Sequence, residues 1–180
     1  MDKFPNKKYN IIYADPPWSM TTLLGRDKRA GNKPHFKLMQ EKDIINLPVK
    51  NIADKNCILF LWVVDSRIMD AGEVIKSWGF QYKTVAFTWV KETVNGKDHM
   101  GGGVWTRKNP EMCLLATKGK IKRLSCGVRQ LQRIVISRVA AKPPLIREKI
   151  IELVGDLPRI ELFARERAPG WDAWGDEVDG

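Results

Sequence analysis

The sequence predicts an α/β fold, because strand-like and helix-like segments alternate along its 180 residues. Residues 57–64 form an uninterrupted apolar run, which is typical of a parallel strand that is covered on both faces. Residues 68–78, which follow directly, place apolar side chains at helical spacing and end at Gly79. A hydrophobic content of 43% is enough for one full-sized core.

The N-terminal half is expected to hold three strands and two helices. Residues 9–14 predict a buried strand, and Asp43 is expected to cap a short helical turn that Pro48 closes. After the second strand at 57–64, Asp65 or Ser66 is expected to cap the longer helix. Residues 82–90 alternate well enough to predict a third strand.

The C-terminal half continues the alternation. Residues 92–110 are polar and contain three consecutive glycines, which predicts a mobile loop between the third strand and a fourth at 111–117. Residues 134–136 predict a short edge strand, residues 145–154 a helix, and residues 159–165 a final strand. The chain contains no internal repeat, low-complexity tract or linker composition, so we expect one domain over residues 1–180.

Basic residues cluster in two stretches of a chain whose net charge is +10. The first stretch contains Arg26, Lys28 and Arg29, and the second lies between Glu111 and Glu148, where no acid occurs. The second stretch holds Lys118, Lys120, Lys122, Arg123, Arg129, Arg133, Arg138, Lys142 and Arg147. Clusters of this kind are typical of proteins that bind polyanions, so we favour nucleic acid as a partner over a merely basic surface.

The remaining composition disfavours metal chemistry and membrane insertion. Three widely spaced cysteines without a CxxC pair and only two histidines argue against a zinc site, and they indicate reduced thiols in a cytosolic protein. No run of 18 apolar residues is present, and residues 1–8 lack the apolar centre of a signal peptide. We therefore expect a cytoplasmic protein of a bacterial or phage-infected cell that binds no metal.

The turn Asp15-Pro16-Pro17-Trp18 directly follows the first predicted strand. Its prolines fix φ near −65° and remove two backbone donors, so the strand cannot continue as a hydrogen-bonded ladder. Rigid carbonyl acceptors then lie beside a carboxylate, and Trp18 offers a flat ring. An ordinary strand-to-loop turn is the alternative interpretation. The preceding strand and the following tryptophan favour a site that holds a planar group by its amino edge.

Further blocks follow this turn in a fixed order: Leu59 to Trp62, Trp78 to Phe80, Trp89 to Lys91, Gly103 to Arg107, Glu111 with Leu114 to Ala116, Gly119, Lys142-Pro143, Arg159 to Arg165, and Gly170 to Gly175. With these blocks the chain resembles the adenine-N6 methyltransferases named after the seventy-kilodalton subunit of the messenger-RNA methyltransferase. Short phage and bacterial members are the most similar. The resemblance covers nearly the whole chain.

The resemblance implies a Rossmann-like methyltransferase sheet, mostly parallel with one antiparallel strand, whose catalytic motif precedes the cofactor-binding strand. It also implies transfer of a methyl group from S-adenosylmethionine to the exocyclic amine of adenine. The catalytic residues implied are Asp15, Pro16, Pro17 and Trp18. The cofactor-binding residues implied are Asp15, Lys142, Glu161, Arg165, Asp176 and Glu177. Asp176 departs from the family pattern, which has asparagine there, because an ionised aspartate accepts but cannot donate a hydrogen bond.

The amine of adenine is a weak nucleophile, because its lone pair is delocalised into the ring. We expect the Asp15 carboxylate and the Pro16 carbonyl to accept its two hydrogens and so favour a pyramidal nitrogen. Tyr13 or Trp18 would stack on the base, which must leave any duplex to reach the site. Glu111 matches a family acid near the target base. Residues of the loops 19–37 and 92–110 are expected to bind phosphates, among them Arg26, Lys28, Arg29 and Arg107.

DNA is favoured over RNA as the substrate, because the chain is short and has no accessory RNA-binding segment. Methylation of the cytosine amine remains an alternative that the same turn could support. Another alternative is a non-catalytic subunit that only holds nucleic acid, although such a subunit has no need of the Asp15 carboxylate. A small-molecule methyltransferase would leave the basic stretches without a purpose, and a homodimer is possible.

Overall fold

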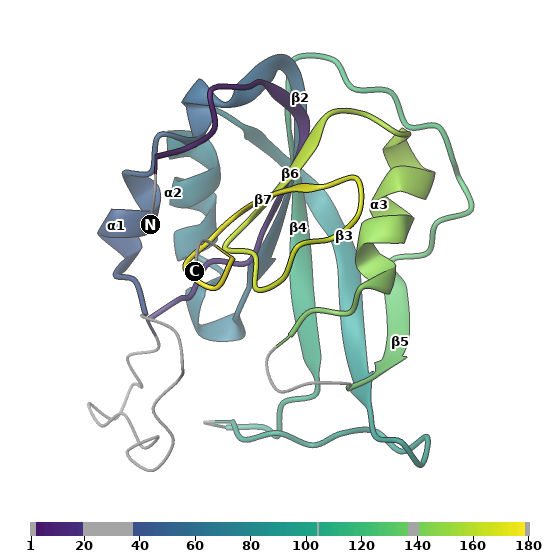
Figure 1. The fold of residues 1–180 in the computed structure, drawn as a ribbon. Helices are drawn as coiled ribbons and strands as arrows, with labels where there is room; N and C mark the ends of the chain where they lie inside the picture. Colours follow the sequence, from purple (N-terminus) through teal and green to yellow (C-terminus); the bar gives the residue numbers. More distant parts are fainter. Residues whose placement is uncertain (1–2, 20–37, 104, 137–140, 179–180) are drawn as a thin grey trace.

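The computed structural model describes residues 3–19, 38–103, 105–136 and 141–178. Within them, seven strands form one sheet in the order β5-β3-β4-β2-β1-β6-β7 (Figure 1). The strands are β1 Tyr9–Ala14, β2 Ala53–Val63, β3 Gln81–Glu92, β4 Pro110–Lys118, β5 Leu131–Val135, β6 Arg159–Leu162 and β7 Asp172–Trp174. Only β4 runs antiparallel to its neighbours among these strands. The expected mostly parallel sheet with one antiparallel strand is therefore confirmed.

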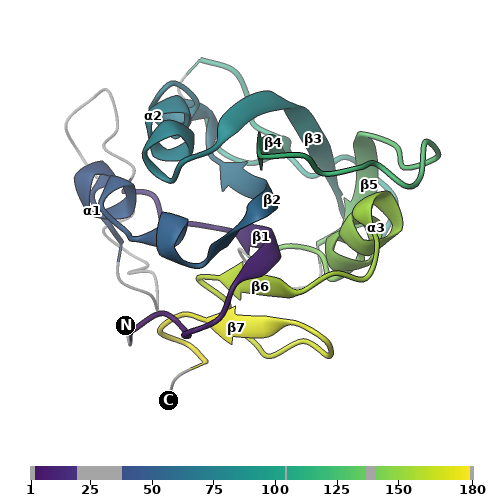
Figure 2. The same ribbon diagram turned by 90° about the horizontal axis from the view of Figure 1, so that it is seen from above.

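Helices cover both faces of this sheet (Figure 2). Helices α1 Glu41–Ile45 and α2 Asp70–Ser77 lie on one face, and α3 Leu145–Val154 lies on the other. Short 3-10 turns, η1 Val49–Asn51 and η2 Asp65–Arg67, precede β2 and α2. None of the helices in the described part of the chain is long and apolar enough to span a membrane.

The central strand β1 contributes to two hydrophobic cores. Successive side chains of a strand point to opposite faces, so Ile12 and Ala14 pack under α1 and α2 while Ile11 and Tyr13 pack under α3. Fully burying a branched apolar side chain contributes roughly 1.5–3 kcal/mol to folding. Because both faces are covered, residues 11–14 of β1 and the second half of β2 are apolar throughout, as the sequence predicted.

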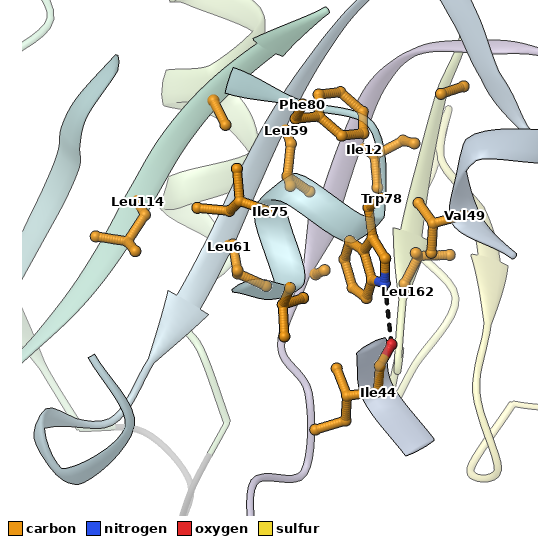
Figure 3. Close-up of a cluster of buried hydrophobic side chains, with 14 of the residues drawn as sticks. Ile12, Ile44, Val49, Leu59, Leu61, Ile75, Trp78, Phe80, Leu114 and Leu162 are labelled. Carbon is orange, nitrogen blue, oxygen red and sulfur yellow. Dashed lines mark hydrogen bonds between the residues drawn. The ribbon is translucent and has the colours of Figure 1, made fainter. Parts of the chain in front are cut away.

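Trp78, at the end of α2, joins the two helices that lie on one face of the sheet (Figure 3). Its ring is fully buried among side chains of β2 and α2, including Leu61 and Ile75. The indole Nε1 donates a hydrogen bond of 2.9 Å to the carbonyl of Ile44 in α1. The chain then turns at Gly79, whose φ of 84° favours a residue without a side chain.

Several elements differ from their predictions. Asp65 and Ser66 lie in η2, and the N-cap position of α2 belongs to Met69, so the cap predicted there is wrong. Strand β6 ends at Leu162, three residues before the predicted end. Asp43 lies inside α1, and the N-cap position belongs to Gln40, so the predicted cap is wrong. Strand β2 begins at Ala53, four residues before the predicted start, and its pairing with β1 shifts register across the polar residues 54–56. Strand β7 was not predicted, since three residues are too few for a periodic pattern. The helix at 145–154 and the edge strand near 134 are confirmed.

The substitution Trp78→Phe keeps an aromatic ring but removes the donor to Ile44. We expect the free energy of unfolding to fall by about 1–2 kcal/mol, because one buried hydrogen bond and part of the ring volume are lost. Urea denaturation followed by circular dichroism measures the change. Unchanged stability would mean that this bond does not hold α1 against α2.

Candidate active site

The candidate site lies where the strand order switches direction. Strand β1 pairs with β2 on one side and with β6 on the other, and ligands of α/β proteins bind beyond the carboxyl ends of strands at such a point. A pocket of about 110 Å³ opens there. It is lined by Asp15, Ala141, Lys142, Pro144, Arg147, Glu161, Phe163, Arg165 and Glu166.

The turn after β1 is fixed by backbone and indole hydrogen bonds. The carbonyl of Pro16 accepts from the Trp18 amide at 2.8 Å, and the indole of Trp18 donates to the carbonyl of Trp62 in β2 at 3.0 Å. A carbonyl oxygen has two lone pairs, and this bond uses one of them. Pro16 itself is buried, and the pocket lining includes Asp15 but not Pro16, Pro17 or Trp18. Asp15 begins the turn, and only 20% of its side chain is exposed.

The two rings that were predicted to stack on the base are buried. Tyr13 is 1% exposed and accepts a hydrogen bond of 2.7 Å from the Trp62 indole, and Trp18 is 5% exposed. Tyr13 also contacts the edge of Trp171. Because the core covers both rings, neither presents a free face, and this arrangement contradicts the predicted stacking role. Their contacts instead hold the Asp15 turn against β2.

Four side chains of alternating charge form the centre of the site. The Lys142 ammonium donates to both carboxylate oxygens of Asp15, at 2.8 and 2.7 Å. It also lies 3.2 Å from Glu111, which accepts a further bond from Lys91. Asp15, Lys142, Glu111 and Lys91 thus form one continuous chain of ion pairs.

Two tryptophans lie beneath the two ammonium groups of this chain. Lys142 Nζ is 5.3 Å from the centre of the Trp62 ring, and Lys91 Nζ is 5.1 Å from that of Trp89. The two indoles meet edge to face at 6.4 Å. Such contacts attract a cation to the ring face and keep water from its underside. The lysines are therefore held by aromatic rings as well as by carboxylates.

Burial and neighbouring charges shift the pKa values of this network in different directions. Burial raises the pKa of Asp15, although the Lys142 ammonium opposes this effect. Burial alone would lower the pKa of Lys142, but the carboxylates of Asp15 and Glu111 outweigh it and raise that pKa. Burial would also raise the pKa of Glu111, yet its two lysine partners lower it to about 2. Glu111 is therefore ionised at neutral pH, and Lys142 is charged.

A second group of charges surrounds the other side of the pocket. Arg147 of α3 donates to both oxygens of Glu161, at 2.6 and 3.3 Å, and also contacts Glu166 at 3.2 Å. Arg165 forms an ion pair with Glu177 at 3.6 Å. Glu161 therefore does not face solvent; it is 8% exposed and paired. Arg147 was not assigned to the site from the sequence, where it was one basic residue among nine in its stretch.

The backbone between these charges has an unusual shape. Phe163, the first residue after β6, has a φ of 61°, a left-handed conformation that is uncommon for a non-glycine residue. Gly175 packs against this turn so closely that a side chain there would meet the Ala164 nitrogen at 2.7 Å. The β6 turn and the segment after β7 thus fix one another, and sequence patterns carry no signal for such a conformation.

The structure brings only part of the predicted residue set together. Asp15, Lys142, Glu161 and Arg165 line the pocket, and Glu111 and Glu177 adjoin them through ion pairs. Asp176 is exposed beside Gly175, and Arg107 donates to the Gly101 carbonyl in the segment between β3 and β4. Arg26, Lys28 and Arg29 lie outside the described residues.

The second basic stretch does not surround the site as a whole. Because β4 runs antiparallel to its neighbours, its first residues, including Glu111, lie at the end of the sheet that carries the pocket. Its last residue, Lys118, lies at the opposite end of the strands. Residues 119–123 follow at that opposite edge, where Leu124 bonds to the end of α3. Among the members of this stretch that the structure describes, Lys142 and Arg147 line the pocket, and both are paired with carboxylates there. Arg138 lies outside the described residues.

Comparison with known proteins identifies this arrangement. Residues 9–177 match the family described as MT-A70. The chain belongs to the MT-A70 family. The matched range contains the Asp15 turn, the ion-pair chain and the pocket, and the resemblance that the sequence blocks indicated is confirmed.

Individual relatives differ in how much of their length the chain spans. Type II methyltransferase M.MunI of Mycoplasma sp is 34% identical over 98% of this chain and 80% of the relative. The human N(6)-adenine-specific methyltransferase METTL4 is 26% identical over 96% of this chain but 38% of its own length. The Arabidopsis thaliana N6-adenosine-methyltransferase non-catalytic subunit MTB is 31% identical over 67% of this chain and 15% of its own length.

The substitution Glu111→Gln tests the ion-pair chain through stability. The pKa of Glu111 is lowered from 4.5 to about 2, so its carboxylate stabilises the fold above pH 4.5 and loses this effect as the pH falls toward 2. We expect the variant to be about 2–3 kcal/mol less stable at pH 7, and the difference to shrink below pH 4.5. Denaturant titrations at pH 7 and pH 3 measure both values. A difference that does not depend on pH would contradict the pairing.

Proposed function

We propose that the chain transfers the methyl group of S-adenosylmethionine to the exocyclic N6 of adenine in DNA, and that residues 1–180 do so as one domain. The chain belongs to the MT-A70 family, and its similarity to the methyltransferase M.MunI over 98% of its length supports the activity. Adenine N6 is the position named in the relative METTL4. The match to a type II methyltransferase along most of both chains supports DNA over RNA. The observation that carries the proposal is the buried Asp15 carboxylate at the pocket, held by the Lys142 ammonium.

The charges of the pocket fit S-adenosylmethionine, which carries a sulfonium, an ammonium and a carboxylate besides its ribose hydroxyls. Glu161 and Glu166 provide acceptors for hydroxyl or ammonium groups, and Arg165 provides a donor for the carboxylate. The left-handed turn at Phe163, which also lines the pocket, lies between them in the sequence. We propose that these residues hold the cofactor, which supplies an electrophilic methyl group when bound.

The residues of the turn after β1 would prepare the amine. Asp15 would accept one N6 hydrogen, and the second lone pair of the Pro16 carbonyl, whose first accepts from the Trp18 amide, would accept the other if the base reaches the buried Pro16. Both acceptors are fixed before the substrate arrives, so orientation and preorganised charge contribute most of the acceleration. The cofactor would supply the methyl group and keep the electron pair of the bond that this group leaves, and N6 would then release one proton. The raised pKa of Asp15 makes its carboxylate a better acceptor for that proton than an exposed aspartate.

A non-catalytic subunit is the second candidate, because MTB, a relative with that description, matches 67% of this chain. The ion-pair chain argues against it. A subunit that only binds nucleic acid gains nothing from a buried carboxylate with a raised pKa, and such a group destabilises the fold.

The nature of the product tests the proposed function. The protein is incubated with S-adenosylmethionine labelled in its methyl group and with DNA or RNA of matched sequence, and the polymers are digested to nucleosides. We expect the label in N6-methyladenine, and more of it from DNA than from RNA. Label in N4-methylcytosine, or no label with any polymer, would contradict the proposal.

The substitution Asp15→Ala removes the acceptor for the amine. We expect methyl transfer to fall by far more than tenfold while cofactor binding, measured by calorimetry, stays within a few-fold of wild type. Asp43→Ala, which removes an exposed carboxylate of α1, serves as the matched control and should keep full activity. Methyl transfer by Asp15→Ala within tenfold of wild type would exclude this role of the carboxylate.

The net charge of +10 predicts that salt weakens binding to DNA. Lysine and arginine contacts with phosphates release counterions, so a plot of log affinity against log salt concentration should fall with a slope of several units. Fluorescence anisotropy with a labelled oligonucleotide measures the slope. Affinity that does not depend on salt concentration would contradict binding of the DNA phosphates by these basic residues.

A further inference from the structure

We propose that Lys142 reads the ring nitrogen beside the target amine, and that Asp15 and Lys142 together select bases with an amine next to an unprotonated ring nitrogen. This inference rests on the proposed function and assigns one of its specificity contacts. Lys142 was expected to contact the cofactor. Its ammonium instead donates to the Asp15 carboxylate, whereas Glu161 at the other side of the pocket pairs with Arg147.

Asp15 and Lys142 present an acceptor and a donor side by side at the pocket. The ammonium lies 2.7 and 2.8 Å from the two carboxylate oxygens, and both side chains line the pocket. They remain 20% and 14% exposed, so a ligand in the pocket can reach them. The Watson–Crick edge of adenine presents the complementary pair, a donor at N6 and an acceptor at N1, on adjacent ring positions.

Binding of the base exchanges one hydrogen bond for two. Lys142 has three N–H groups, of which two lie on Asp15 and one points to Glu111. When N6 donates to one oxygen of Asp15, Lys142 can turn the N–H that leaves this oxygen toward N1. Asp15 keeps two donors and Lys142 keeps three acceptors, so neither buried charge loses a partner. An unsatisfied buried charge would be costly, and the exchange avoids it.

The surroundings of Lys142 keep it a donor. Glu111 lies 3.2 Å from its ammonium and is itself held by Lys91, and the Trp62 ring lies beneath at 5.3 Å. An ammonium has three donors and no acceptor. Guanine and thymine carry an N–H at the corresponding ring position, so this donor would meet the Lys142 ammonium, which is also a donor. Their neighbouring carbonyl, an acceptor, would meet the Asp15 carboxylate, which is also an acceptor. A site built on buried polar groups rejects such bases because those groups are left unpaired.

Base analogues test this contact without altering the protein. The wild-type chain is given DNA that carries adenine, 1-deazaadenine or 7-deazaadenine at its target position, and kcat/KM for methyl transfer is measured. 1-Deazaadenine has a C–H in place of N1, whereas 7-deazaadenine changes the opposite edge of the base and serves as the control. We expect 1-deazaadenine to lose about tenfold or more, because the contact comes from a charged donor, and 7-deazaadenine to react like adenine.

The variant Lys142→Met separates the contact from the intrinsic reactivity of the analogue. In this variant the ratio of adenine to 1-deazaadenine should fall toward one, whatever its absolute rate. Equal reaction of the wild type with all three bases would overturn the inference and leave the proposed function intact. A wild-type ratio that persists unchanged in Lys142→Met would also overturn it. No transfer to any base would overturn the proposed function and the inference with it. If the variant does not fold, the wild-type comparison decides alone.

Discussion

The position of the Lys142 ammonium between two half-buried carboxylates is the constraint on which the site depends. Asp15, Glu111 and Lys142 come from the end of β1, the start of β4 and the segment before α3. Each of these charges would destabilise the fold by several kcal/mol if it were buried without a partner. Together they compensate one another, so the ion pairs favour the arrangement in which the three segments meet at the pocket.

The topology explains how these segments meet. The parallel strands end at the pocket, and the one reversed strand, β4, begins there, so Glu111 reaches the same edge as Asp15. Trp62 of β2 connects the parts, since its carbonyl binds Trp18, its indole binds Tyr13, and its ring lies under Lys142. The aromatic residues near the site thus hold the backbone of the Asp15 turn and support the Lys142 ammonium, and they are themselves buried in the core.

Local sequence patterns were sufficient for most of the fold but only for part of the site. Buried strands such as 9–14 and the helix at 145–154 are strongly periodic or apolar, so their positions could be predicted. The sequence blocks also located Asp15, Lys142 and Glu111. The pairing of Lys142 with Asp15, 127 residues away, depends on the strand order, which no local pattern encodes. Because the strand order is not visible in local patterns, Tyr13 and Trp18 were wrongly expected to present a face to the base. For the same reason Arg147 was not assigned to the site.

The protonation of Lys142 is the most direct measure of this account, because the ammonium charge holds the two carboxylates together. Side-chain NMR of lysine-labelled protein, assigned through Lys142→Met, follows Nζ as the pH is raised. We expect Lys142 to titrate above the ordinary lysine pKa of 10.5 in the wild type, and Glu111→Gln to lower the pKa of Lys142. A Lys142 that loses its proton below 10.5 in the wild type would contradict the account.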